Sequence, residues 1–279
     1  MTARRDEAGY ALIAAVASIA FFALVSLMMI EATRGTVMVA GAELSRARLL
    51  AAADAGVAIA LQDLMQPNPI SKVPINGSAR ELTYDRYLLR VAVDDERGKI
   101  ALNQLNKQQV EVMFSGFGVQ GAALEEAVDG FLDWRDEDDS PRARGAEDGE
   151  YAARGIVARN GPLKTVGELA LIHGVGPALA ARMAPVVTLN FGLRGEFDPR
   201  TASAIARRVM IESDADGASA ADAVQVREAT SLGDSNSLIG RPLTIRVEAS
   251  DGQGGHARRR LIIELAGADG RTYFVRARD

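Results

Sequence analysis

The hydrophobic pattern opens with 21 uncharged, mostly apolar residues from Tyr10 to Ile30. A helix of that length covers about 31 Å at 1.5 Å per residue, which is enough to cross the hydrocarbon core of a bilayer. A secretory signal peptide has a shorter apolar stretch that is followed by small residues, whereas here the small residue Gly9 comes before the run. This order indicates a leader that is cut after Gly9 on the cytoplasmic side, so that the apolar helix stays on the mature protein. The alternative is a simple signal anchor in which Gly9 has no role.

The helical pattern continues beyond the membrane-length run. Val57, Leu61 and Leu64 are spaced 4 and 3 residues apart, which places them on one helix face. No proline interrupts the pattern before Pro67. We therefore predict one long helix from about Tyr10 to Met65, whose first half lies in lipid and whose second half lays an apolar stripe on a globular domain.

Strand patterns appear in two places that are far apart in the sequence. After a predicted loop over residues 67–80, residues 81–93 alternate between polar and apolar side chains and predict a strand. A turn over residues 94–98 leads to the start of a second strand over residues 99–102. Three further strands, separated by Asp-Gly turns, are predicted over residues 243–249, 257–265 and 272–278.

The region between the two groups of strands has helical patterns. Residues 213–240 within it are rich in Ala, Ser, Asp and Gly, and we expect at least part of them to be mobile. The helix signals are an apolar face over residues 121–134, a capping box of Thr165 and Glu168, Pro177 after two glycines, and Asp198 before Pro199.

The pattern as a whole predicts an α+β fold. It has a long N-terminal helix, a small antiparallel sheet that is split in the sequence, and a large all-α domain inserted into the split. The predicted divisions are a leader (1–9), the long helix (10–66, transmembrane over 10–30), a split α/β domain (67–102 and 241–279) and an inserted helical domain (103–240).

Composition narrows the chemistry. The chain has 279 residues, no cysteine and two histidines. Zinc ribbons and cysteine nucleophiles are therefore excluded, and a histidine-based centre has little to build on. The formal net charge of −5 opposes general nucleic-acid binding, which needs a basic face. The acidity is local, because residues 125–150 hold eleven acidic and three basic residues, so that this segment is −8 and the remainder is +3.

Residues 172–180 contain the Gly-Val-Gly-Pro sequence of a helix–hairpin–helix unit. In DNA-binding versions of this unit the glycines let backbone N–H groups approach a phosphate at the start of a helix. The basic residues near the hairpin are Lys164, Arg182 and Arg194, and an acidic segment precedes it. Since phosphate binding usually takes several Lys or Arg side chains, the sequence favours a packing module and leaves DNA binding as the alternative.

The acidic segment is the second motif that could carry chemistry. Ca²⁺ takes six to eight hard oxygen ligands, whereas Mg²⁺ demands stricter octahedral geometry and transition metals usually recruit His or Cys. The twelve-residue spacing of an EF-hand is absent, and a solvated acidic loop is the alternative. Paired carboxylates can also hydrolyse glycosides, but five Tyr and one Trp offer little surface on which a sugar could stack. The clustered acids are Asp133, Asp136, Glu137, Asp138, Asp139, Glu147 and Asp148.

The N-terminus resembles that of type IV pilin-like proteins, in which a prepilin peptidase cuts after the glycine. By this resemblance the mature chain begins at Tyr10, directly after Gly9. Most pilin-like proteins carry Glu at the fifth mature position, where it pairs with the amino terminus of a neighbouring subunit. Here that position is Ala14. Within the superfamily a missing Glu marks the minor pseudopilin called protein K of the type II secretion system.

The acidic segment and the hairpin also look like the signature of the protein K family. The resemblance covers nearly the whole chain and is weakest over residues 190–240, because Leu189–Arg194 stands where many relatives have an Asn-rich run. The matching residues are Asp133-Trp134-x-Asp136-x-Asp138, Gly145-Ala146-Glu147-Asp148, Tyr151, Asn160-Gly161-Pro162-Leu163, Val166, Glu168-Leu169 and Gly174-Val175.

The resemblance implies a pilin-like α/β domain with a large helical domain of the helix–hairpin–helix or SAM-like kind inserted into it. It also implies that the inserted domain binds a structural Ca²⁺. On a helix end, Trp134 is expected to point away from its acidic neighbours into the core. The candidate ligands that the resemblance carries over are Asp133, Asp136, Asp138, Glu147 and Asp148, with Asp139 less favoured.

The resemblance further implies a structural protein and not an enzyme. The expected role is that of a minor pseudopilin at the tip of the type II secretion pseudopilus, with one helix in the bacterial inner membrane and the globular part in the periplasm. The expected partners are the minor pseudopilins I and J, the major pseudopilin and the prepilin peptidase, with no nucleic acid. The alternative is a membrane-anchored helix–hairpin–helix protein that captures DNA.

Overall fold

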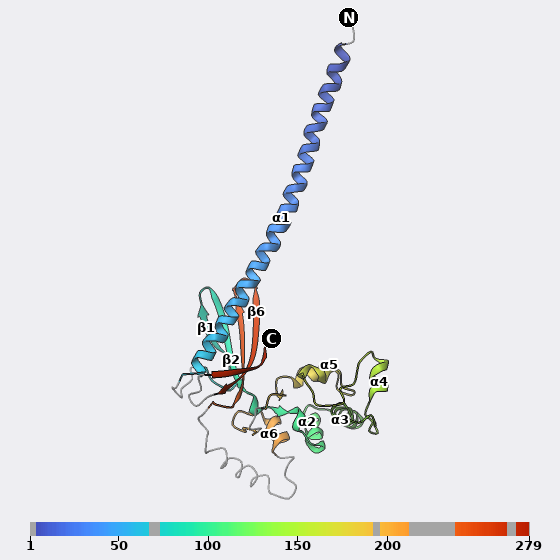
Figure 1. Cartoon of the computed structure of the whole chain (residues 1–279), viewed down its shortest axis with the longest axis vertical. Helices are drawn as coiled ribbons and strands as arrows, with labels where there is room; N and C mark the ends of the chain where they lie inside the picture. The colour runs from blue at the N-terminus through green and yellow to red at the C-terminus, as the bar shows by residue number, and fades with distance from the viewer. Residues whose placement is uncertain (1–3, 67–72, 192–195, 212–237, 267–271, 279) are drawn as a thin grey trace.

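The computed structural model describes residues 4–66, 73–191, 196–211, 238–266 and 272–278 (Figure 1). Its first element is a single helix, α1 (Arg4–Leu64), which confirms the long helix predicted from the sequence, although α1 begins before Tyr10. Residues 67–72 of the predicted loop, and residues 213–237 of the segment expected to be mobile, lie outside the described residues. Both expectations stay predictions.

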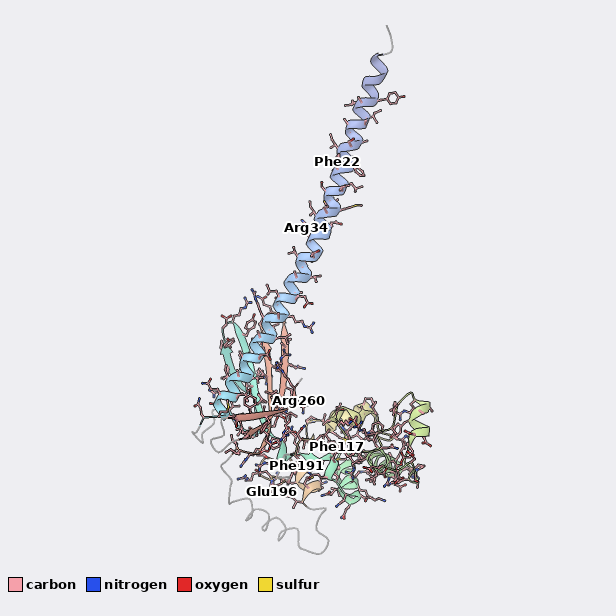
Figure 2. The ribbon with its side chains drawn as sticks, viewed as in Figure 1. Phe22, Arg34, Phe117, Phe191, Glu196 and Arg260 are labelled. Carbon is pink, nitrogen blue, oxygen red and sulfur yellow. The ribbon has the colours of Figure 1, made fainter. Side chains whose placement is uncertain are left out.

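The two halves of α1 have different surroundings. The N-terminal half projects away from the rest of the molecule, and Figure 2 places Phe22 and Arg34 on this projecting part. By length and composition α1 could cross a membrane, and none of its most apolar stretch is buried in the molecule. Burial begins at Leu49, which is 5% exposed. At Gly56 an added Cβ would lie 2.7 Å from Val247 Cγ1, so a glycine there allows the helix to approach the sheet closely.

The sheet on which α1 lies has five antiparallel strands in the order β1-β2-β5-β6-β7. This order places β2 beside β5, although the whole helical region separates them in the sequence. The three strands predicted at the C-terminal end are confirmed as β5, β6 and β7. The bounds are β1 (Arg80–Tyr84), β2 (Tyr87–Asp95), β5 (Pro242–Ser250), β6 (His256–Ala266) and β7 (Thr272–Arg278).

One strand prediction near β2 was wrong, and a second was confirmed as a strand but in another sheet. The single strand predicted over residues 81–93 is a hairpin, because Asp85 adopts a φ of 53° and turns the chain between β1 and β2. The second strand predicted at residues 99–102 does not join this sheet. It is β3 (Ile100–Ala101), which pairs in parallel with β4 (Val187–Thr188), because both of its residues are buried in the core of the helical region.

The helices lie beside one end of the sheet (Figure 1). The helix over residues 121–134, the capping box at Thr165 and the proline in the first turn at Pro177 are confirmed. The start predicted at Asp198 was wrong, because Ser203 caps the helix by accepting the Ala206 N–H at 3.2 Å. The elements are η2 (Leu102–Gln104), α2 (Lys107–Gly116), α3 (Ala122–Arg135), α4 (Asp148–Ala153), η3 (Val166–Ala170), α5 (Gly176–Met183) and α6 (Ala204–Met210).

Buried apolar side chains of the described residues form two clusters, one between α1 and the sheet and one among the helices.

Charged residues around η1 (Glu96–Gly98) lie where the sheet meets the helical region. Glu96 is 1% exposed, pairs with Lys99, and accepts hydrogen bonds from Thr188 Oγ1 on β4 at 2.5 Å and Thr244 Oγ1 on β5 at 2.6 Å. We call this set the ionic joint: Asp95, Glu96, Arg97, Lys99, Asp198, Arg200 and Arg241.

Candidate metal centre

Two helix ends bring the acidic residues together. Helix α3 ends at Arg135 because the next residue, Asp136, has an extended backbone with φ −81° and ψ 176°. Helix α4 begins after Glu147, which is also extended, with φ −121° and ψ −169°. Residues 136–147 therefore form a loop between the two helices, which we call the acidic loop.

Three carboxylates of the acidic loop converge. Oxygen atoms of Asp136, Asp138 and Glu147 lie within 4.8 Å of one another. Asp138 is exposed, Asp136 is half-buried, and Glu147 is only 4% exposed. Negative charges at this spacing repel one another, and a cation between them would reverse the sign of the interaction.

The buried member of the cluster has no partner of its own. Neither carboxylate oxygen of Glu147 has a partner at hydrogen-bond distance among the described residues, although the side chain faces the Glu150 backbone N–H in a capping box. Asp136 Oδ1 is also buried without a partner there. Burial, together with the charges of Asp133, Asp136 and other nearby aspartates, raises the pKa of Glu147 from 4.5 to about 7. Since an unpaired buried carboxylate costs free energy, these oxygens are available to an external ligand.

Asp133 lies beside the cluster and is already paired. Its side chain is 0% exposed, forms an ion pair with the guanidinium of Arg142, and accepts the Arg142 backbone N–H at 3.1 Å. The same guanidinium donates to Asp136 Oδ2 at 2.6 Å. Sequence reasoning missed Arg142, because nothing in the spacing of the acids indicates which arginine lies among them.

The remaining predicted residues lie at the rim. Asp148 is exposed in the first turn of α4 and is not one of the three converging carboxylates. Asp139 is exposed and accepts a hydrogen bond from Asn160 Nδ2 at 2.6 Å. Asn160 itself has a left-handed φ of 39° and a buried Oδ1 without a partner among the described residues. The structure thus brings three of the five predicted ligands together and leaves Asp133 and Asp148 beside them.

An aromatic pair fixes the two ends of the acidic loop. Trp134 on α3 and Tyr151 on α4 are buried edge-to-face, with ring centroids 4.9 Å apart. The Tyr151 hydroxyl accepts the backbone N–H of His173 at 3.0 Å, which links α4 to the predicted hairpin. The expectation that Trp134 belongs to the core is confirmed.

The donor set fits a hard cation. The three converging ligand groups are all carboxylates, which suit Ca²⁺ or Mg²⁺ better than a transition metal. The buried oxygens without partners on Glu147 and Asp136 support this fit. Three carboxylates supply only part of the six to eight ligands that Ca²⁺ takes, so other oxygens would have to complete the shell.

One of the two hairpin glycines, Gly174, is used for packing, whereas Gly176 has open space where a Cβ would lie. Gly174 has a φ of 75°, and an added Cβ there would lie 2.6 Å from the backbone nitrogen of Ala127 on α3. An added Cβ on Gly130 of α3 would lie 2.5 Å from the carbonyl oxygen of His173. Both glycines therefore permit close backbone contact between α3 and the hairpin, which supports the interpretation of this segment as a packing module.

The fold and the site together define an α+β protein whose apolar N-terminal helix is long enough to cross a membrane and lies on an antiparallel sheet. Residues 88–191 match the family described as type II secretion system (T2SS), protein K. This stretch includes all of β2 but its first residue, the acidic loop and the hairpin. The resemblance to the protein K family predicted from the sequence is confirmed over these residues.

A solved structure has a similar fold. It is the crystal structure of the GspK-GspI-GspJ complex from the enterotoxigenic Escherichia coli type 2 secretion system. The similarity has a TM-score of 0.64 at 16% sequence identity and covers 86% of this chain and 98% of the other. No curated protein sequence matches the chain.

Proposed function

We propose that this chain is a minor pseudopilin that works at the tip of the type II secretion pseudopilus, as a structural component of protein export and not as an enzyme. The observation that carries the proposal is the protein K match over residues 88–191, on a fold in which an apolar helix continues onto a sheet. The same proposal assigns residues 67–102 and 241–279 to a pilin-like domain and residues 103–240 to an inserted domain of the helix–hairpin–helix or SAM-like kind.

The membrane half of the proposal rests on α1. Its exposed apolar stretch begins at Tyr10 and would form a single span of the bacterial inner membrane, with the globular part in the periplasm. A prepilin peptidase would remove the leader after Gly9. Mass spectrometry of the membrane-extracted protein should find Tyr10 as the first residue, and an intact Met1 would contradict this processing.

The partners we propose are the minor pseudopilins I and J, with the major pseudopilin below them. The similar chain of known structure was solved in a complex of GspK with GspI and GspJ. In the present chain the projecting half of α1 is exposed and apolar, as a helix packed among other helices would be.

A position at the tip follows from charge and bulk. Ala14 offers no carboxylate to the amino terminus of another subunit, and an isolated buried ammonium is costly. The helical region also adds bulk beside the sheet that a repeating lattice would have to accommodate (Figure 1). Both features are tolerable in a subunit with no further subunit above it.

Immunogold labelling of pseudopili from cells that express the tagged chain tests this position. Label at one end of each filament is expected, together with fewer or shorter filaments on overexpression. The matched variant Ala14→Glu should behave in the same way, because the helical region remains. Label along the whole length would contradict the cap.

We also propose that the acidic loop holds a structural Ca²⁺ through Asp136, Asp138 and Glu147, with Asp133 and Asp148 the less favoured of the predicted ligands. The support is the convergence of three carboxylates and the absence of partners for Glu147 among the described residues. Ca²⁺ would place a positive charge beside Glu147, which has no ion pair among the described residues, and would tie the end of α3 to the start of α4.

DNA capture is the second candidate function. The observation that favours it is the hairpin sequence before α5, although Gly174 of this hairpin is used for contact with α3. Gel-shift experiments at physiological salt should detect no complex, because few basic side chains surround the hairpin. Submicromolar, salt-dependent binding would promote this alternative over the pseudopilin.

A further inference from the structure

Asp133 joins the acidic loop to α3. It lies on the last turn of α3, and its carboxylate contacts both the backbone N–H and the guanidinium of Arg142, in the middle of the loop. Each of these contacts crosses from the helix to the loop. With its side chain 0% exposed, the carboxylate is enclosed by protein.

Gly145 shows how closely the loop backbone fits against Asp133. An added Cβ on Gly145 would overlap the Asp133 carboxylate. The Gly145 N–H also donates to the Arg142 carbonyl at 3.1 Å, which closes the turn that surrounds this carboxylate. By contrast, an added Cβ on Gly149 in α4 would have no atom within 4 Å.

Arg142 also contacts one of the three converging carboxylates. Its guanidinium donates to Asp136 Oδ2 at 2.6 Å while it pairs with Asp133. A cation bound by Asp136 has to compete with this guanidinium. The ion pair between Asp133 and Arg142 therefore affects how readily Asp136 can bind a cation.

We propose that Asp133 is a positioning residue for the metal site and not a ligand. It holds Arg142, and through Arg142 the acidic loop, so that Asp136, Asp138 and Glu147 face one another. The inference rests on the proposed calcium site and deepens it.

A double-mutant cycle on the full chain in detergent separates positioning from ligation. Affinity is measured with Tb³⁺, whose emission can be excited through Trp134, the single tryptophan of the chain. Asp133→Asn should lower the affinity roughly 10–100-fold, as loss of a partner that orients metal ligands does. In an Arg142→Gln background the same substitution should lower the affinity clearly less, because only the backbone N–H of residue 142, and no guanidinium, is left for Asp133 to hold. A direct ligand would cost a similar factor in both backgrounds, and that result would overturn the proposal.

A pair of glycine variants gives an independent arm. Gly145→Ala should weaken Tb³⁺ binding without altering any carboxylate, whereas Gly149→Ala should leave it unchanged. In EDTA, hydrogen exchange of the Arg142 amide should be slow in the unaltered chain and fast in Gly145→Ala, because that amide donates to Asp133. Equal Tb³⁺ affinities for the two glycine variants would overturn the proposal even if Asp133→Asn fails to fold.

The arms also separate this inference from the proposed metal site. If the unaltered chain binds neither Tb³⁺ nor Ca²⁺, the metal site fails and the inference fails with it. If the unaltered chain binds metal but the cycle shows equal losses, only the positioning role of Asp133 is overturned.

Discussion

The ionic joint and the acidic loop each bury a glutamate, but only the joint supplies that glutamate with a cation and hydrogen-bond donors from the chain itself. Glu96 in the joint is 1% exposed, pairs with Lys99 and accepts hydrogen bonds from two threonine hydroxyls. Glu147 in the acidic loop is 4% exposed and has no partner for either carboxylate oxygen among the described residues.

The two regions differ in how their buried negative charge is balanced. A buried charge must be matched by another charge or by hydrogen bonds. The joint contains its own cations and hydroxyls, drawn from the sheet and from the helical region, so it can hold the two regions together without a ligand. The acidic loop has two arginines, and no ion pair joins either of them to Glu147 among the described residues. Arg142 pairs with Asp133 and Asp136, and Arg144 pairs with Glu125 on α3. The Ca²⁺ proposed above would balance part of the remaining negative charge.

The largest expected effect on stability comes from removing Lys99, the cation that pairs with Glu96 in the joint. Lys99→Met should lower the free energy of unfolding by about 3–5 kcal/mol, because Glu96 would stay buried without its cation. Urea unfolding should give the same loss in EDTA and in calcium, since the joint uses no external ion. If calcium restored the stability of Lys99→Met, the conclusion that the joint works without an external ion would be wrong.

Removal of calcium is expected to matter next. At a hundredfold excess over Kd, a ligand that binds only the folded state adds about 2.7 kcal/mol of stability. The full chain in detergent should therefore melt several degrees lower in EDTA than in calcium. The double variant Asp136→Ala and Glu147→Ala should abolish this difference, whereas Asp148→Ala should keep it, because Asp148 lies outside the convergence. Identical melting of the unaltered chain in both conditions would show that the acidic loop is a solvated loop without a stabilising Ca²⁺ site.

The pH dependence in EDTA sharpens the comparison further. A folded-state pKa raised to about 7 means that the folded protein binds a proton at Glu147 more tightly than the unfolded chain does. This contribution is complete below about pH 4.5 and is lost as the pH rises through about 7. Between about pH 5 and pH 7 the loss should approach about 2 kcal/mol, since each unit of pKa shift corresponds to about 1.4 kcal/mol.

Thermal melting of the unaltered chain and of Glu147→Gln over this pH range measures the effect. The variant stays neutral, and its melting temperature in EDTA should lose this part of the pH dependence. A similar fall in both proteins would assign the dependence to other groups.

The smallest expected effect lies at the rim of the joint. Arg200 is 46% exposed and pairs with Asp198 at 2.8 Å, where its hydrogen bonds help to lower the Asp198 pKa against the effect of burial. Arg200→Ala should cost less than about 1 kcal/mol, because Arg97 still pairs with Asp198. A lowered carboxyl pKa contributes stability that is lost as the pH falls, so the variant should differ most from the unaltered chain at neutral pH and least in acid.

Several elements followed from local pattern alone. The long helix is determined by an apolar and small-residue run that no proline interrupts, and the three C-terminal strands by alternation between turns. The local density of acids also indicated where a cation could bind, and three of the five predicted residues converge there. These features depend on residues close in sequence, because the periodicity of apolar residues matches the repeat of a helix or a strand.

Other features were decided only by the tertiary structure. The departure of β3 from the main sheet, the choice of β5 as the neighbour of β2, and the pairing of Arg142 with Asp133 and Asp136 all depend on which distant segments meet. Glu96 has three partners, at separations of 3, 92 and 148 residues, and Glu147 has none among the described residues. No local pattern distinguishes these two glutamates. Burial and partners set the free energy of a carboxylate, and both are properties of the folded chain.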